Sequence, residues 1–387
     1  MTRSQYGGKI VFVAMSGGVD SSVAALLLKK QGYKVIGVFM RCYNIDGCAE
    51  KDAEDARRVA EKLKIPFYVW DFETEYKKKV VDYMVKGYKK GITPNPDVMC
   101  NREIKFGLFL EKALKMGADY VATGHYVKSQ ISNLKSQNLV KLYQAKDLNK
   151  DQSYFLWTLT QKQLKHCLFP IGDYLKSEVR KIAKKANLPT AGKKDSQGIC
   201  FLGQVNLSDF LKKYIPEKRG DILLITDINI PCDRKKCYQN NIKYKKIGKH
   251  KGAHFYTIGQ RHINANFQFP ISNFQENRKP YYVAEKNVKK NTIVVAEGDD
   301  NPALYKKEIK LTDVNFINPV NSQILENIGI NILTRVRYRQ PLVSAKLKIK
   351  NLKLKIEFNE PIKFIAPGQS AVFYNEKGEM LGGGVIL

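Results

Sequence analysis

Two features of this sequence have residue types suited to chemistry: a turn rich in glycine and serine near the start, and two cysteines farther along. The turn, "SGGVDSS" at 16–22, separates the apolar run "KIVFVAM" from the apolar run "VAALLLKKQGY". Glycines permit a tight turn, and a helix start offers unpaired N–H groups and the positive end of the helix dipole to an anion. The turn therefore predicts a phosphate-binding site between a strand and a helix.

The details of this turn narrow the kind of phosphate site. It lacks the Lys-Ser or Lys-Thr ending of a Walker A loop, and it is not a G-x-G-x-x-G motif. It resembles the PP-loop of ATP pyrophosphatases, which grip the β- and γ-phosphates of ATP and release pyrophosphate, leaving AMP on the substrate. This resemblance implies ATP, with Asp20 helping to hold Mg²⁺ or to position the phosphates. The alternative is an ordinary Gly-rich turn with a serine cap.

The two cysteines lie in "TPNPDVMCNREIKFG" (Cys100) and "KKDSQGICFLG" (Cys200). We expect Cys100 to open a helix, where the dipole lowers the pKa of a thiol, with Arg102 and Lys105 nearby. Cys200 follows a glycine turn and precedes apolar residues. For either residue the alternative is an inert, buried thiol.

The elements that must position these residues follow from hydrophobic periodicity. Up to about Asp209, short β-branched runs such as "KVIGVFM" and "ADYVATG" alternate with helical stretches such as "AEDARRVAEKLK". This alternation predicts a doubly wound parallel sheet, an α/β fold with helices on both faces.

Beyond Asp209 the pattern changes to β structure. The mixed, basic stretch 211–301 predicts a small β-rich module, and the alternation in "VSAKLKIKNLKLKIEF" predicts an antiparallel sheet or barrel that ends in the hairpin "AVFYNEKGEMLGGGVIL". We expect three domains, 1–209, 210–301 and 302–387. The low-complexity stretch "SQISNLKSQNL" is predicted to be a hairpin insertion.

Composition limits the class of protein. The chain has 387 residues and a formal charge of +29, which favours a polyanion as partner, although a lysine-rich proteome would also raise the charge. There is no apolar stretch of about 20 residues and no secretory signal pattern, so we expect a cytoplasmic protein with no membrane association. Seven cysteines, an odd number, favour reduced thiols.

Eight short motifs in order indicate a family. They are "SGGVDSS", "TPNPDVMCNREIKF", "ATGHY", "KDQSYFL", "KKDSQGICFLG", "HFYTIGQRH", "RVRYRQP" and "APGQSAVFY". With these motifs the chain resembles the bacterial tRNA-specific 2-thiouridylases, the MnmA family, over nearly its whole length. The resemblance implies a PP-loop domain, a small central domain and a C-terminal β-barrel. It also implies replacement by sulfur of the C2 oxygen of the wobble uridine in tRNAs for Lys, Glu and Gln.

The resemblance also implies roles for individual residues. Cys200 would carry a persulfide delivered by a cysteine desulfurase or relay protein. Cys100 would be the second thiol, a nucleophile that releases sulfide or closes a transient disulfide with Cys200. Asp97 would be a general acid or base beside the flipped-out base. ATP would contact Ala14, Met15, Ser16, Gly17, Gly18, Val19, Asp20, Ser21, Met40 and Gly124. The tRNA would contact Asn95, Pro96, Asp97, His125, Lys150, Asp151, Gln152, Arg337, Tyr338 and Gln369.

Metal sites are not expected, although one spacing matches a zinc finger. The pattern C-x4-C-x12-H-x3-H falls on Cys232, Cys237, His250 and His254. The helix that should carry both histidines would contain two glycines, which disfavour it. We expect the basic, aromatic stretch 231–262 to contact an RNA backbone instead, the alternative being a solvated face. Cys42 and Cys48 do not have the spacing of an iron–sulfur site and are expected to be ordinary thiols.

Other function classes remain open from the residues alone. The chain could be another PP-loop RNA thiolase, an ATP pyrophosphatase that amidates a metabolite, or a tRNA-binding protein without activity. The charge and the additional β domain argue against a metabolite enzyme, and the intact loop and thiols argue against a binding module. We expect a monomer that binds one tRNA.

Overall fold

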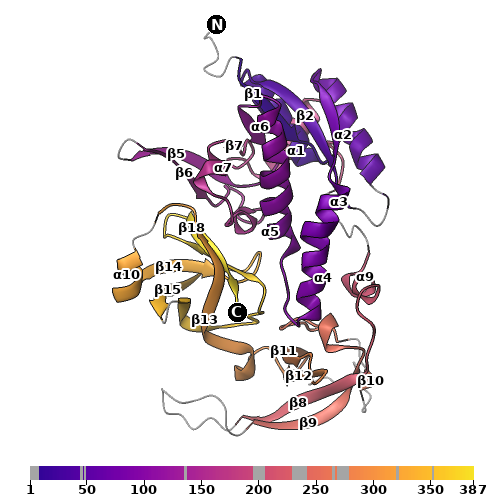
Figure 1. Cartoon of the computed structure of the whole chain (residues 1–387), viewed down its shortest axis with the longest axis vertical. Helices are drawn as coiled ribbons and strands as arrows, with labels where there is room; N and C mark the ends of the chain where they lie inside the picture. The colour runs from indigo at the N-terminus through magenta and orange to yellow at the C-terminus, as the bar shows by residue number, and fades with distance from the viewer. Residues whose placement is uncertain are drawn as a thin grey trace.

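The structure, a computed structural model, describes residues 8–43, 47, 49–134, 137–194, 205–228, 242–263, 266–267, 279–319, 322–350 and 353–387. Within these residues the strands form three sheets, and one hairpin from the first predicted region joins the sheet of the last (Figure 1). Cys48, Cys200, Cys232 and Cys237 lie outside the described residues. No helix in the described part has the length and apolar character needed to cross a bilayer.

The first sheet is parallel, with strand order β3-β2-β1-β4-β7. Its strands are β1 (Ile10–Ala14), β2 (Lys34–Arg41), β3 (Phe67–Asp71), β4 (Tyr120–Ala122) and β7 (Cys167–Leu168). Side chains of successive β1 residues enter different cores, because Val11 and Val13 pack in one apolar cluster while Phe12 and Ala14 pack in another. Burial on both faces explains why β1 is continuously apolar, and the predicted doubly wound sheet is confirmed.

Helices cover both faces of this sheet. One face is covered by α1 (Val19–Lys30), α2 (Ala49–Leu63) and α8 (Lys176–Lys185), whose buried residues join the cluster of Val11 and Val13. The other face is covered by two long helical rods made of successive segments. These are α3 (Glu73–Tyr76), η1 (Lys77–Val81) and α4 (Asp82–Lys89), then α5 (Pro96–Cys100), η2 (Asn101–Phe109) and α6 (Leu110–Lys115).

The two rods extend away from the sheet toward the other two domains (Figure 1). Gly87 in α4 lies against Pro94, where an added Cβ would come within 2.7 Å of the proline ring. The chain between α4 and α5 can therefore turn back tightly. This places the start of α5 between the sheet domain and the C-terminal domain.

The second sheet forms the β-rich module predicted after Asp209. Its order is β10-β9-β8-β12-β11, with β8 and β12 parallel and the other pairs antiparallel. It contains β8 (Gly220–Ile228), β9 (Ile242–His250), β10 (Asn266–Phe267), β11 (Tyr281–Asn287) and β12 (Thr292–Glu297), preceded by α9 (Leu207–Lys212) and followed after β9 by η4 (Ala253–Phe255).

The C-terminal strands close into an antiparallel barrel, because β13 pairs with both β16 and β18. The strands are β13 (Tyr305–Phe316), β14 (Ile330–Arg335), β15 (Val343–Lys350), β16 (Lys353–Lys363), β17 (Ser370–Tyr374) and β18 (Glu379–Ile386), with η5 (Pro302–Leu304) and α10 (Ser322–Asn327). The alternating run predicted from the sequence is the antiparallel pair β15–β16, with Leu347 and Ile356 opposite each other in the barrel core.

A hairpin of the first domain joins this barrel. The predicted insertion forms β5 (Lys128–Leu134) and β6 (Gln137–Tyr143), and β6 pairs with β18, placing Tyr143 opposite Glu379. The short elements η3 (Ser153–Phe155) and α7 (Gln161–Leu164) follow it. The first and last domains therefore share one hydrogen-bonded sheet.

Candidate functional site

The predicted phosphate loop joins β1 to α1 in the expected order. Gly17 has φ +70°, and a Cβ there would overlap the backbone carbonyl oxygen of Asp52. Gly18 is the N-cap of α1 and has no side chain to cap the helix. No N-cap side chain accepts a hydrogen bond from the first-turn N–H groups, which suits them to bind an anion from outside the chain.

The serines of the loop have different roles. The Ser16 N–H donates to Ser21 Oγ at 3.1 Å, which fixes the turn, and Ser16 itself is exposed. The Ser22 hydroxyl donates to Gly18 O at 2.7 Å and accepts a hydrogen bond from Thr190 at 3.0 Å. Ser22 is thus committed to holding the loop to the chain after α8, while Ser16 faces solvent.

Gly124, after β4, packs closely against the phosphate loop. A Cβ at this position would lie 2.6 Å from the Ser21 nitrogen and 2.8 Å from the Asp20 carbonyl carbon. Only glycine lets the segment after β4 come this close to the first turn of α1. Met40, near the end of β2, is partly buried opposite Trp70 of β3. Contact of Gly124 or Met40 with adenosine stays a prediction.

Asp20 is held by two side chains that the sequence did not indicate. Lys176, the first residue of α8, places its Nζ 2.8 Å from both carboxylate oxygens of Asp20. The Tyr126 hydroxyl donates to Asp20 Oδ1 at 2.9 Å. No local pattern could have shown this group, because Lys176 lies 156 positions beyond Asp20.

The second part of the site is the short helix α5. Asn95 is its N-cap and accepts a hydrogen bond from the Val98 N–H at 3.2 Å, and Pro96 is its first residue. The helix therefore begins before Asp97, and Cys100 is its fifth residue. The prediction that Cys100 opens the helix was wrong, because an asparagine cap followed by proline starts it one turn earlier, and the helix dipole acts mainly within the first turn.

Cys100 is buried, with 5% of its surface exposed, in the core of the helical rods. Arg102, expected beside it, instead lies 3.0 Å from Asp313 of the barrel and 3.2 Å from its neighbour Glu103. The guanidinium charge is thus balanced by carboxylates.

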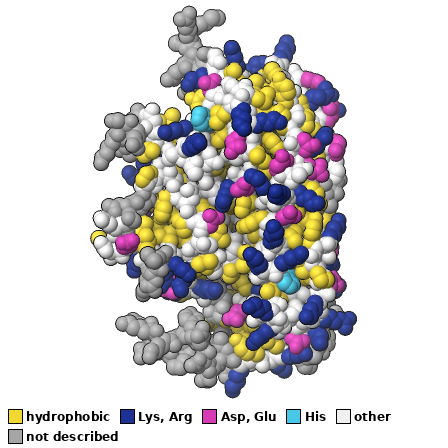
Figure 2. All heavy atoms as spheres, in the orientation of Figure 1, with side chains coloured by type: hydrophobic (Ala, Val, Ile, Leu, Met, Phe, Trp, Pro, Cys, Tyr) yellow, Lys and Arg dark blue, Asp and Glu magenta, His cyan; other side chains and the backbone are white. Residues whose placement is uncertain are grey.

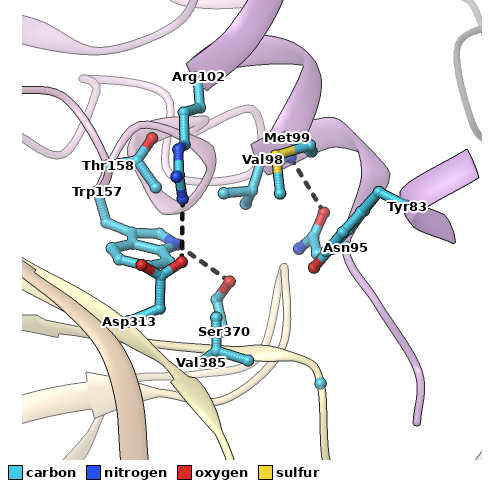
Figure 3. A pocket seen from close by; sticks show the side chains of 11 residues that line it. Tyr83, Asn95, Val98, Met99, Arg102, Trp157, Thr158, Asp313, Ser370 and Val385 are labelled. Carbon is cyan, nitrogen blue, oxygen red and sulfur yellow. Dashed lines mark hydrogen bonds and ion pairs between the residues drawn. The ribbon is translucent and has the colours of Figure 1, made fainter. Parts of the chain in front are cut away.

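A small pocket separates α5 and η2 from the barrel (Figure 3). Its lining is Tyr83, Asn95, Val98, Met99, Arg102, Trp157, Thr158, Asp313, Gly368, Ser370 and Val385. Residues 95, 98, 99 and 102 lie on one face of the helix by its 3.6-residue period, and Asp97 and Cys100 lie on the other. The pocket therefore lies between two domains and is not lined by the Cys100 thiol.

A barrel loop fixes the segment that leads into α5. The Thr93 N–H donates to Pro367 O at 2.7 Å, and Gln369 Nε2 donates to Thr93 O at 2.9 Å. Gly368, with φ +90°, lies so close that a Cβ would be 3.0 Å from Ile92 Cβ and from Thr93. We call residues 366–370 the clamp loop. Gln369, predicted to contact tRNA, is used here to position Thr93 and Pro94.

Three other predicted tRNA contacts also have internal partners. His125 is buried, its Nδ1 lies 2.7 Å from the Thr123 hydroxyl, and burial, with a smaller effect of the Lys105 charge, holds its pKa well below the usual value. Gln152 Oε1 accepts a hydrogen bond from the Tyr126 N–H at 3.0 Å. Asp151 is 1% exposed and lies 2.9 Å from Arg335 of the barrel. The Asp151 carboxylate has no surface to offer an RNA in this structure.

Of the remaining predicted contacts, Asn95 and Pro96 are buried, while Asp97, Arg337 and Tyr338 are partly exposed. A nitrogen of Arg337 donates to the Ile258 carbonyl of the central domain. The Tyr338 ring centroid is 4.4 Å from that of Phe155. Lys150 is also partly exposed. RNA binding by these residues stays a prediction.

The part of the basic stretch that leads to His250 is the strand β9, where a zinc finger would need a helix, while Cys232 and Cys237 lie outside the described residues. His250 ends β9, and its Nδ1 accepts a hydrogen bond from the Gly252 N–H at 2.9 Å, while His254 Nδ1 lies 3.0 Å from Tyr88 O. Within the described residues no group of three His, Cys, Asp or Glu side chains is placed to hold a metal. Figure 2 shows Lys and Arg side chains spread over the visible face, including its lower end.

Three family patterns match successive parts of the chain. They are described as the tRNA methyl transferase HUP domain (9–204), the tRNA methyl transferase PRC-barrel domain (208–297) and the aminomethyltransferase beta-barrel domain (306–386).

Full-length relatives are similar over the whole chain. The tRNA-specific 2-thiouridylase MnmA of Karelsulcia muelleri is 44% identical, covering 98% of each chain. The protein of the same name from Staphylococcus epidermidis is 43% identical, covering 97% of this chain and 94% of its own. A solved 4-thiouridine synthetase bound to RNA and ATP is 16% identical with a TM-score of 0.32, covering 54% of this chain and 51% of that one.

Proposed function

The chain belongs to the MnmA family of tRNA-specific 2-thiouridylases, and from this premise we propose that it replaces the C2 oxygen of the wobble uridine with sulfur in tRNAs for Lys, Glu and Gln. The observation that carries the proposal is the pairing of two sites in one chain. An uncapped helix start suits phosphates, and the barrel holds the segment that leads into the short helix of Asp97 and Cys100.

We assign ATP to the first site. Gly17 lets the loop approach the backbone of Asp52, and Gly124 lets the segment after β4 approach the first turn of α1, more closely than any Cβ would allow, so both glycines hold the loop in shape. The residues that would hold ATP are those of 14–21, with Met40 and Gly124 toward the adenosine, and Asp20 would hold Mg²⁺. ATP supplies an adenylyl group that turns the uridine oxygen into a leaving group.

The reaction balances in two displacements. The uridine O2 attacks the α-phosphorus, the bond to the bridging oxygen breaks, and pyrophosphate leaves. A sulfur nucleophile then forms a bond to C2, and AMP leaves with the original oxygen. Asp97 accepts or donates the proton that the uridine must lose and regain.

The two thiols, of Cys200 and Cys100, have different roles in the sulfur transfer. We assign the persulfide to Cys200, which lies outside the described residues, and the second thiol to Cys100. Cys100 attacks the inner sulfur of the Cys200 persulfide, which releases the outer sulfur as sulfide and leaves a disulfide. Burial among apolar residues keeps Cys100 away from solvent oxidants until the base is in place.

The partners follow from charge and chemistry. A formal charge of +29 suits tRNA, and the exposed lysines of β9 suit its backbone. A persulfide donor, a cysteine desulfurase or relay protein, must supply the sulfur. We place the enzyme in the cytoplasm as a monomer, with domains at 1–209, 210–301 and 302–387.

Mass spectrometry of digested tRNA tests this function. Purified protein, ATP, Mg²⁺, a sulfide source and unmodified tRNA are expected to give 2-thiouridine at the wobble position together with pyrophosphate. A product with sulfur at another position, or pyrophosphate release without RNA, would contradict the proposal.

Cysteine variants test the sulfur route with a persulfide donor as the source. Cys100→Ser and Cys200→Ser are expected to lose thiolation. The matched control is Cys167→Ser, since Cys167 is equally buried, donates to Gln163 O at 3.1 Å and has a pKa raised by burial. Thiolation that survives in either test variant would remove that thiol from the route.

A further inference from the structure

The phosphate loop contains an acid but no cation. A triphosphate carries about four negative charges, and P-loops of the Walker type include a lysine to balance them. Here the charged side chain in 16–22 is Asp20, which would repel phosphates. Besides any Mg²⁺ held by Asp20, a basic side chain that balances the phosphates would therefore have to come from elsewhere in the fold.

Lys176 is the cation that the fold brings to this loop. Its Nζ lies 2.8 Å from both oxygens of Asp20, which is the second residue of α1, and the Lys176 side chain is 12% exposed. A phosphate held by the first-turn N–H groups of α1 would lie beside this ammonium group.

The position of Lys176 is fixed by its own helix. Lys176 begins α8, and its backbone N–H donates to Asp147 Oδ2 at 2.9 Å. Val179 and Ala183 of α8 are fully buried in the same core as Val23 of α1. Packing between α1 and α8 thus holds the lysine against the loop before any ligand arrives, which reduces the ordering cost of binding.

We propose that Lys176 is the phosphate-binding lysine of this ATP site and that Asp20 holds it in readiness. When ATP binds, the ammonium group passes from the carboxylate to the β- and γ-phosphates, and the Asp20 carboxylate becomes available to Mg²⁺. Tyr126, whose hydroxyl donates to Asp20 at 2.9 Å, keeps the carboxylate oriented during the exchange. The inference rests on the proposed function only in taking ATP as the ligand.

Calorimetric binding of α,β-methylene-ATP and of AMP, with Mg²⁺ and without tRNA, tests the proposal. Lys176→Gln is expected to weaken binding of the triphosphate by about tenfold to a hundredfold, as the loss of a charged hydrogen bond does, and to weaken AMP binding much less. Lys176→Arg is expected to restore most of the affinity. The control is Lys184→Gln, an exposed lysine in the last turn of the same helix.

A second variant separates phosphate binding from simple neutralisation of Asp20. In an Asp20→Asn background, a phosphate-binding Lys176 still contributes, so Lys176→Gln is expected to weaken triphosphate binding again. If Lys176 acts only through Asp20, the second change has no effect, and the proposal is overturned. Equal losses for AMP and the triphosphate, or unchanged triphosphate binding in folded Lys176→Gln, would also overturn it.

The outcome is independent of the thiolation test. Wild-type protein that binds the triphosphate through Lys176 but makes no 2-thiouridine would contradict the proposed function and leave this inference standing. If wild-type protein thiolates tRNA but Lys176→Gln binds the triphosphate normally, the proposed function stands and this inference is overturned. Circular dichroism and thermal unfolding of each variant establish that it is folded.

Discussion

At the scale of single residues, Asp151 links two domains through a buried charge. Its carboxylate accepts hydrogen bonds from the N–H groups of Ala145 and Ser153 and lies 2.9 Å from Arg335. The side chains of Asp151 and Arg335 are 0% and 5% exposed. Breaking such a pair leaves an unbalanced charge inside the protein, which costs more than the pair itself contributes.

We expect Asp151→Ala to lower the free energy of unfolding by about 3–5 kcal/mol, because Arg335 would remain buried without its partner. The matched control is Arg57→Ala in the exposed pairs with Glu54 and Glu61, where a loss below about 1 kcal/mol is expected. Urea unfolding followed by circular dichroism measures both. Equal, small losses for the two variants would show that Asp151 does not stabilise the domain contact.

Lys286 makes the contact between α4 and the central domain sensitive to pH. Its Nζ donates to Tyr256 O at 2.7 Å and lies 6.0 Å from the centroid of the Tyr88 ring. Burial lowers its pKa from 10.5 to about 8. Between these values the unfolded chain binds more protons than the native protein, so this residue's contribution to stability rises with pH.

We therefore expect the stability difference, wild type minus Lys286→Met, to increase as pH rises from about 8 toward 10, by up to about 3 kcal/mol for the full pKa difference. Urea unfolding at a series of pH values measures it. Lys289→Met, at an exposed position in the following turn, is expected to show no such trend. A constant difference across this range would mean that burial does not lower the pKa of Lys286.

At the scale of elements, the clamp loop and the start of α5 form one unit. Gly368 has both a left-handed backbone, with φ +90°, and a close approach to Ile92 and Thr93. A side chain there would push the clamp loop away from the residues that lead to Asp97 and Cys100. The position of the predicted acid and thiol thus depends on a loop of another domain.

Gly368→Ala is expected to lower the rate of tRNA thiolation at least tenfold, about 1.4 kcal/mol of lost positioning, while ATP binding stays near normal. The control is Gly117→Ala, because Gly117 has a similar φ of +87° but nothing within 4 Å of an added Cβ. The Gly117→Ala variant has the backbone strain of a positive φ, about 1 kcal/mol, without a steric clash. Single-turnover thiolation assays measure the rates, and equal rates for the two variants would contradict the coupling.

The elements also show what the sequence alone could predict. Periodicity located β1, α2 and the β15–β16 pair, because each signal lies within about a dozen neighbouring residues. It predicted the hairpin β5–β6 but not its pairing with β18, and it could not place Lys176 beside Asp20. Those contacts join residues far apart in the chain, and neither partner has a local sequence pattern that predicts the other.

At the scale of the whole molecule, three domains hold one another in place. The barrel shares a sheet with β6, the clamp loop holds residues 93–94, and His254 of the central domain contacts Tyr88 of α4. The strand β9, at the far end of the molecule from α2, presents exposed lysines (Figure 1). The same arrangement that positions α5 therefore extends a basic surface away from it, as a long RNA partner requires.

This surface leads to a prediction about salt. If about six phosphates are neutralised on binding, tRNA affinity is expected to fall about a thousandfold between roughly 50 and 200 mM salt, because counterions are released. Lys251→Gln, exposed just after β9, is expected to reduce the slope of log K against log salt by about one, while Lys62→Gln, exposed on α2, leaves it unchanged. Filter binding across a salt series measures the slopes. Equal slopes for both variants would show that the RNA does not use the β9 surface, and a slope near zero in the wild type would mean that the charge of +29 has another cause.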